Sequence, residues 1–215
     1  MNISQSKIVS FIWGIADDCL RDVFVRGQYR DVILPMVVLR RFDALLEATK
    51  DKVEAEIKAQ REIGLDEESY DEGALCDITG LTFYNTSKWT LNRIKSQATD
   101  NNDILLNNFT EYLNGYSENV KDVLLNFDYY SKAERLAKND RLLAIIEKIT
   151  DPYINLTDRA ATDPDGLPLP SLSNIAMGTI FEELLRKFNE ENNEESGAHF
   201  TPRDAIALLA LGSSQ

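Results

Sequence analysis

The residues best suited to hold a ligand lie near the C-terminal end of the 215-residue sequence. Thr201-Pro202-Arg203-Asp204 has the composition of a helix start, because threonine caps a helix with its hydroxyl and proline suits the first helical position. A helix start carries free amide donors and a positive dipole end, and both attract a carboxylate or phosphate group. The alternative is an ordinary helix start without a ligand, and the segment by itself fits both interpretations.

Five arginines in the first 41 residues form a second candidate site. The candidates for contact with nucleic-acid phosphates are Arg21, Arg26, Arg30, Arg40 and Arg41. The net charge of −13 opposes the approach of the whole chain to a polyanion. Residues 1–60 nevertheless carry nine basic and nine acidic side chains, so this part of the chain is charge-balanced. A solvated, ion-paired face is the alternative interpretation of the cluster.

The remaining reactive side chains exclude several kinds of chemistry. The sequence has one histidine, His199, which cannot by itself form a histidine-based metal cluster and makes a histidine-dependent catalytic triad unexpected. We therefore expect no metal site. Cys19 and Cys76 are too few for a disulfide scaffold, which favours a reduced, cytoplasmic protein. No apolar run approaches the roughly 20 residues of a membrane helix, and residues 1–7 have no export signal. We therefore expect no membrane partner.

Helical periodicity dominates the elements that must position these residues. Apolar side chains recur at helical spacing from Ile8 to Val23, with Ser4 or Ser6 as the expected cap. A second helical stretch covers about 30–62, with one apolar face, a charged outer half, and Pro35 in its first turn or at a kink. Further helices are predicted from Thr86 or Ser87 to Lys95, over 104–116, 120–127 and 131–138, from Asn139 or Asp140 to Ile149, and from Ser173 to Phe188.

Little in the sequence indicates strands. Residues 64–80 are predicted to form a long acidic loop, and 81–84 a short extended segment. No stretch has sustained strand alternation, so the predicted fold class is all-α. Four of the six prolines lie within 151–170, which indicates a domain boundary. The predicted division is an N-terminal helical domain over 1–160, a second unit over 161–211, and a tail over 212–215.

Three segments together resemble the modification (methyltransferase) subunit of type I restriction–modification systems. The first is Phe11-Ile12-Trp13 followed by Tyr29-Arg30-Asp31-Val32-Ile33-Leu34-Pro35 and Leu39-Arg40-Arg41-Phe42-Asp43. The second, Met177-Gly178-Thr179-Ile180-Phe181-Glu182-Glu183-Leu184-Leu185, is similar to the family's Gly-x-Ile-Phe/Tyr-Glu helix. The third, Gly197-Ala198-His199-Phe200-Thr201-Pro202-Arg203, is similar to its Gly-Glu-x-Phe/Tyr-Thr-Pro-Arg segment, with Ala198 where glutamate is usual.

This resemblance implies a site-specific DNA methyltransferase that modifies the N6 atom of adenine and uses S-adenosylmethionine. In the family, a helical N-terminal domain precedes a Rossmann-like catalytic domain. The Thr-Pro segment lines the cofactor pocket, so Phe200, Thr201 and Pro202 are expected to lie beside the cofactor. The implied partners are a specificity subunit, a second modification subunit, a restriction subunit, and double-stranded DNA held within the complex.

Two segments resemble parts of methyltransferase signatures without completing them. Asp151-Pro152-Tyr153-Ile154 lacks the second proline of the Asn/Asp-Pro-Pro-Tyr/Phe catalytic motif, and Asp163-Pro164-Asp165-Gly166 lacks the second glycine of the Asp-Pro-x-x-Gly-x-Gly cofactor loop. In the family, both motifs follow the Thr-Pro segment. We therefore expect no catalytic residue in this chain, and residues 161–211 to be the leading helices of a truncated Rossmann-like methyltransferase domain. The alternative function is a stand-alone α-helical protein-interaction or adaptor module.

Overall fold

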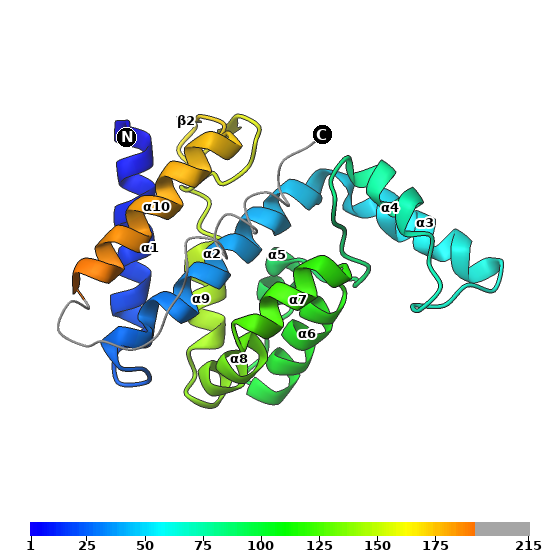
Figure 1. Cartoon of the computed structure of the whole chain (residues 1–215), viewed down its shortest axis with the longest axis horizontal. Coiled ribbons are helices and arrows are strands. Elements are labelled where there is room, and N and C mark those ends of the chain that lie inside the picture. The colour runs from blue at the N-terminus through cyan, green and yellow to red at the C-terminus, as the bar shows by residue number, and fades with distance from the viewer. Residues whose placement is uncertain (192–215) are drawn as a thin grey trace.

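The computed structural model describes residues 1–191, and this part of the chain is mostly helical (Figure 1). Its α-helices are α1 (Ile3–Leu20), α2 (Tyr29–Leu46), α3 (Lys50–Glu62), α4 (Glu72–Thr79), α5 (Leu91–Ser96), α6 (Asn102–Asn114), α7 (Glu118–Asn126), α8 (Tyr129–Lys138), α9 (Leu142–Ile149) and α10 (Asn174–Glu191). Two 3₁₀ helices, η1 (Arg26–Gln28) and η2 (Glu47–Thr49), flank α2. The strands β1 (Ala161–Thr162) and β2 (Pro168–Leu169) pair antiparallel. The predicted helical fold is therefore confirmed, apart from this short hairpin.

Helix α2 runs through the middle of the molecule. Helices α1 and α10 lie on one side of it and α5–α8 on the other (Figure 1), and α9 packs against both α1 and α2. All side chains from Val32 to Ala44 are buried. A helix that is buried all round needs neighbours on every face, and the helices around α2 supply them. The sequence predicted that the outer half of the helical stretch over 30–62 is charged and faces solvent. This is wrong for α2, because the neighbouring elements also cover Arg40, Arg41 and Asp43.

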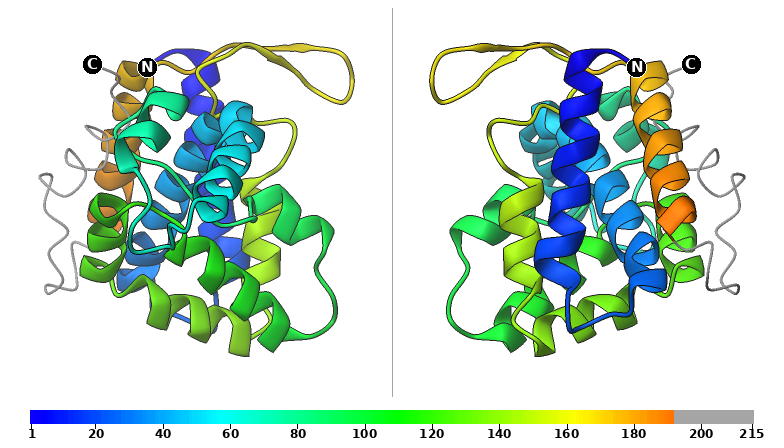
Figure 2. Two further views of the ribbon diagram at one scale, coloured as in Figure 1. Left: turned by 90° about the vertical axis from the view of Figure 1, so that its right-hand side faces the viewer. Right: turned by 90° about the vertical axis from the view of Figure 1, so that its left-hand side faces the viewer.

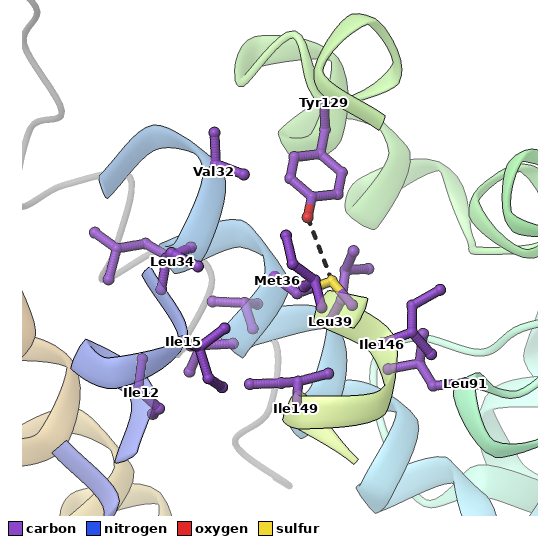
Figure 3. Close-up of a cluster of buried hydrophobic side chains, with 14 of the residues drawn as sticks. Ile12, Ile15, Val32, Leu34, Met36, Leu39, Leu91, Tyr129, Ile146 and Ile149 are labelled. Carbon is purple, nitrogen blue, oxygen red and sulfur yellow. Dashed lines mark hydrogen bonds between the residues drawn. The ribbon is translucent and has the colours of Figure 1, made fainter. Parts of the chain in front are cut away.

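The core forms where α1, α5, α8 and α9 meet α2 (Figure 3). The hydroxyl of Tyr129 points into this cluster and donates a hydrogen bond to the sulfur of Met36 at 3.3 Å. Each labelled residue of this cluster is at most 3% exposed. The labelled residues are Ile12, Ile15, Val32, Leu34, Met36, Leu39, Leu91, Tyr129, Ile146 and Ile149. Full burial of one such aliphatic side chain contributes about 1.5–3 kcal/mol, so this cluster is a principal source of stability.

Helices α1 and α10 lie side by side and run in the same direction, whereas the β1–β2 hairpin projects from the body (Figure 2). The rings of Trp13 and Phe188 pack with their centroids 4.7 Å apart. Five buried residues of α10 belong to the same hydrophobic cluster as α1 and α2: Met177, Ile180, Phe181, Leu184 and Phe188. Helix α10 thus packs directly on the helical domain. The division between residues 160 and 161 stays a prediction.

Helices α3 and α4 form an arm at one end of α2 (Figure 1). A smaller apolar cluster holds the arm together, built from Val53, Ile57, Tyr70, Leu75 and Tyr84. The sequence predicted one long loop over 64–80, which is wrong because α4 occupies its second half. The Asp71 side chain caps α4 by accepting from the Ala74 amide at 3.1 Å, and Gly80 ends it at a φ of +67°.

The predicted starts of several helices are corrected by the residues that cap them. Helix α1 begins at the capping residue Asn2, which forms a reciprocal capping box with Gln5, and not at Ser4 or Ser6. Thr90, and not Thr86 or Ser87, caps α5, because its hydroxyl accepts from the Arg93 amide at 3.0 Å. The N-cap of α9 is Arg141, without a side-chain cap bond.

Three further expectations concern breaks and termini. Pro35 lies in the second turn of α2, and the predicted long helix over 30–62 divides instead at η2. Residues 81–84 form no strand; next to them, Asn85 makes an isolated β-bridge with Tyr116. The prediction that Ser173 opens a helix is confirmed, because its hydroxyl accepts from the Ala176 amide at 3.1 Å. None of the helices within residues 1–191 is long and apolar enough to span a bilayer.

Two glycines provide opposite tests of this packing. A Cβ at Gly115 would lie 2.6 Å from both Asn85 Oδ1 and the Ser87 backbone nitrogen, so Gly115→Ala should lower the free energy of unfolding by about 1–3 kcal/mol. A Cβ at Gly14, inside α1, meets nothing within 4 Å, so Gly14→Ala should raise it by about 0.4–1 kcal/mol. Urea unfolding measures both, and an unchanged or raised stability of Gly115→Ala would contradict the packing described.

Candidate functional site

The five arginines predicted to contact phosphates do not form one surface. Arg40 and Arg41 are buried in α2, with exposed fractions of 8% and 4%. The side chains of Arg21 and Arg26 are 65% and 60% exposed, whereas that of Arg30 is only 12% exposed. Two of the five, Arg21 and Arg26, are therefore largely exposed.

Arg40 belongs to a buried polar network centred on Asp43. Its Nη1 atom lies 3.4 Å from Asp43 Oδ2, and the amide of Leu91, the first residue of α5, donates to Asp43 Oδ1 at 3.1 Å. The hydroxyl of Tyr112 on α6 also hydrogen-bonds Asp43 and lies 2.7 Å from the Tyr116 hydroxyl. The network therefore ties α5 and α6 to the central helix.

Burial dominates the electrostatics of this network. It raises the pKa of Asp43 to about 6, although Arg40 and the Leu91 amide act in the opposite direction. Burial likewise raises the pKa of Tyr112 and Tyr116 well above their ordinary range. A carboxyl group that titrates near pH 6 suits proton transfer, but Asp43 is enclosed by its partners, so we assign it a structural role.

Arg41 fastens the segment before α10 to the central helix. Its Nη1 atom donates to the Leu156 carbonyl at 2.6 Å, and its Nη2 atom donates to Asn174 Oδ1 at 2.8 Å. Burial lowers the pKa of Arg41. Arg40 and Arg41 are thus buried and bonded inside the protein, so they do not form one exposed cluster with the other three arginines.

Arg21, Arg26 and Arg30 lie around the turn between α1 and α2, each beside an acidic side chain. Arg21 lies 3.6 Å from Asp17, Arg26 contacts Glu191 of α10 at 2.6 Å, and Arg30 lies 3.5 Å from Asp31. Arg30 also donates to Asn189 Oδ1 at 2.9 Å. This is the ion-paired face that was the alternative interpretation, and phosphate contact by the exposed arginines stays a prediction.

Lys50 is a buried charged residue that sequence reasoning did not single out. Its ammonium group, at the start of α3, donates to the Asn85 carbonyl at 3.2 Å and to the Ser87 carbonyl. Burial lowers its pKa to about 8. The sequence places Lys50 among other charged residues, so it carries no signal that distinguishes this lysine from its exposed neighbours.

Two polar hollows lie beside these residues. A groove of about 670 Å³ runs between α3, the 86–88 segment and α6, with Glu54, Lys58 and Glu111 among its walls. A second cavity, of about 400 Å³, is lined by Arg41 and residues that precede and begin α10. Within residues 1–191, no group of three or more histidine, cysteine or acidic side chains could hold a metal ion.

The remaining motif residues are turns or lie beyond the described part of the chain. Asp151 accepts from the Tyr153 amide, and Asp163 accepts from the Asp165 and Leu167 amides at 2.9 and 2.8 Å. Both segments are therefore turns. The predicted cofactor-proximal residues Phe200, Thr201 and Pro202 lie outside the described residues, as does His199.

A family model described as the HsdM N-terminal domain matches residues 8–149. The match begins inside α1 and ends at the last residue of α9, so it includes the central helix, the arm and the Asp43 network. Among curated proteins and among solved structures, no match was found.

The Asp43 network predicts a specific pH dependence of stability. The carboxyl titrates at 3.8 in the unfolded chain and at about 6 in the folded protein, so its stabilising effect is complete below about pH 4 and is lost as the pH rises through 6. From this group alone, the free energy of unfolding should fall by roughly 3 kcal/mol over that range. Asp43→Asn removes the titration and should flatten this part of the profile.

Urea unfolding from pH 4 to pH 7 compares the two proteins. The difference between them isolates Asp43, because every other titratable group is shared. Profiles that run parallel over this range would mean that Asp43 is not buried as a titrating carboxyl.

Proposed function

Because the chain belongs to the HsdM N-terminal domain family, the N-terminal region of type I restriction–modification modification subunits, we propose that it serves a site-specific DNA methyltransferase that modifies adenine N6. The observation that carries this proposal is the match over residues 8–149, which extends from within α1 to the end of α9. The helical domain assembles with the specificity subunit and a second modification subunit and closes over DNA. A restriction subunit can join this complex.

Methyl transfer itself is proposed to depend on residues outside the described helices. The methyl donor is S-adenosylmethionine, with Phe200, Thr201 and Pro202 beside it in the cofactor pocket. The contacts of the buried charges support this division, because Arg40 is paired with Asp43, and Asp43 and Lys50 are bonded to neighbouring segments. The helices thus have the character of a binding and assembly unit, acting in the cytoplasm.

The charge distribution supports a role that depends on partners. The chain carries a net charge of −13, which opposes encounter with DNA, and Arg21 and Arg26 both lie beside carboxylates. DNA contact is therefore expected once another subunit holds the duplex in place. The chain alone should not bind duplex DNA measurably near physiological salt.

Co-expression with the cognate specificity subunit tests the proposal. We expect the two chains to co-purify and to elute as one species in size-exclusion chromatography with light scattering. A specificity subunit from an unrelated type I system is the matched control and should not co-purify. If the cognate subunit does not associate, the assembly role fails and a stand-alone adaptor module becomes the better reading.

A charge exchange between Arg26 and Glu191 tests for phosphate contact in the assembled complex. Arg26→Glu should weaken binding to all DNA sequences alike and lower the salt dependence by about one unit for the lost contact. Adding Glu191→Arg restores the ion pair of 2.6 Å but leaves a negative charge at position 26, so DNA binding should stay weak.

Fluorescence anisotropy across a salt series measures both variants. Lys138→Glu is the control, since Lys138 is similarly exposed and also paired, with Glu134. If the double exchange restores DNA affinity, Arg26 serves only to hold α10 and the phosphate contact is refuted.

A further inference from the structure

Arg41 is an unusual residue because its charge is buried without an adjacent counter-ion. Its guanidinium makes two hydrogen bonds, and both acceptors, the Leu156 carbonyl and the Asn174 side-chain oxygen, are neutral. No carboxylate of the described residues lies within ion-pair distance of it, and Asp158 acts on it only from further away. Buried charges in proteins are usually paired with a charge of opposite sign. The positive charge of Arg41 lacks such a partner among the described residues.

Arg41 lines a cavity of about 400 Å³ that opens to the surface between α2, the end of α4 and the segment before α10. This volume lies within the range of about 300–1,000 Å³ that is typical of ligand sites. Its walls are mostly polar and come from Thr79, Gly80, Leu81, Asp158, Ser171, Ser173 and Asn174, with Leu45 beside Arg41. A buried cation at the wall of such a cavity attracts an anion from solution.

The wall also offers hydroxyl donors. Ser171 and Ser173 both line the cavity, and Ser173 uses its oxygen to accept from the Ala176 amide, which leaves its hydroxyl proton available. The guanidinium supplies several further N–H donors in a fixed plane. Donors that approach from different directions match a tetrahedral oxyanion, whose oxygens also point in different directions.

We propose that this cavity binds a phosphate group, with Arg41, Ser171 and Ser173 as its donors. The cavity has more room than a phosphate alone fills, so the natural ligand carries a further part. Asp158, whose nearest ion-pair partner is Arg159 at 3.5 Å, lines the same cavity and weakens anion binding by repulsion. This site is independent of the assembly role, because it needs neither a second subunit nor the cofactor.

Thermal unfolding of the chain in inorganic phosphate tests the proposal. At constant pH and ionic strength, replacing chloride by phosphate should raise the Tm of the natural protein progressively, because a ligand that binds only the folded state stabilises it. Asp158→Asn should enlarge this rise. Ser171→Asp, which places a carboxylate in the cavity, should abolish it, and the neutral control Ser171→Asn should retain most of it.

Both positions are exposed at the surface, so these variants are expected to fold. An equal Tm rise in all four proteins would be a general salt effect and would overturn the proposal, as would the absence of any rise in the natural protein. The source of the phosphate is distinguished with two further probes. A variant-dependent rise with 5′-adenylate indicates a free phosphate monoester, and one confined to a short DNA duplex indicates a backbone phosphate.

Discussion

The burial of α2 on all its faces is the constraint on which the rest of the structure depends. A helix without a solvent-facing side must still accommodate its charged residues, and α2 carries three of them in its second half, Arg40, Arg41 and Asp43. An unpartnered charge at these positions would cost several kcal/mol. Each is bonded inside the protein: Arg40 pairs with Asp43 within α2, and Asp43 and Arg41 bond to elements that surround the helix.

The buried charges of α2 form bonds to elements on both sides of this helix. Asp43 accepts the amide of Leu91 and fastens α5, whereas Arg41 reaches the Leu156 carbonyl and Asn174 and fastens the start of α10. The family match includes the first of these attachments and ends before the second. The helical domain thus holds the beginning of α10 by a charged residue of its own central helix, and the rest of α10 packs along α1 and α2.

Most helices could be predicted from the sequence, but the way in which they pack around α2 could not. Periodicity located α1, α6 and α10, and serine at 173 identified the cap of α10, because both signals are local. The burial of Arg40 and Arg41 was not predictable, since it depends on which elements cover α2. Helix α4 was missed because its acidic cap, Asp71, lies among other acidic residues and resembles a loop. The arginines were grouped by nearness in sequence, whereas the fold separates them.

Native-state hydrogen exchange tests the central position of α2 most directly. The amides from Val32 to Phe42, apart from Pro35, which has no amide hydrogen, should exchange only through global unfolding, with the free energy and denaturant dependence of the whole domain. The amides of α4, which rests on the smaller apolar cluster, should exchange through openings of lower free energy. If α2 amides exchange through low-energy openings while those of α6 remain protected, the other helices do not depend on α2 and the account is wrong.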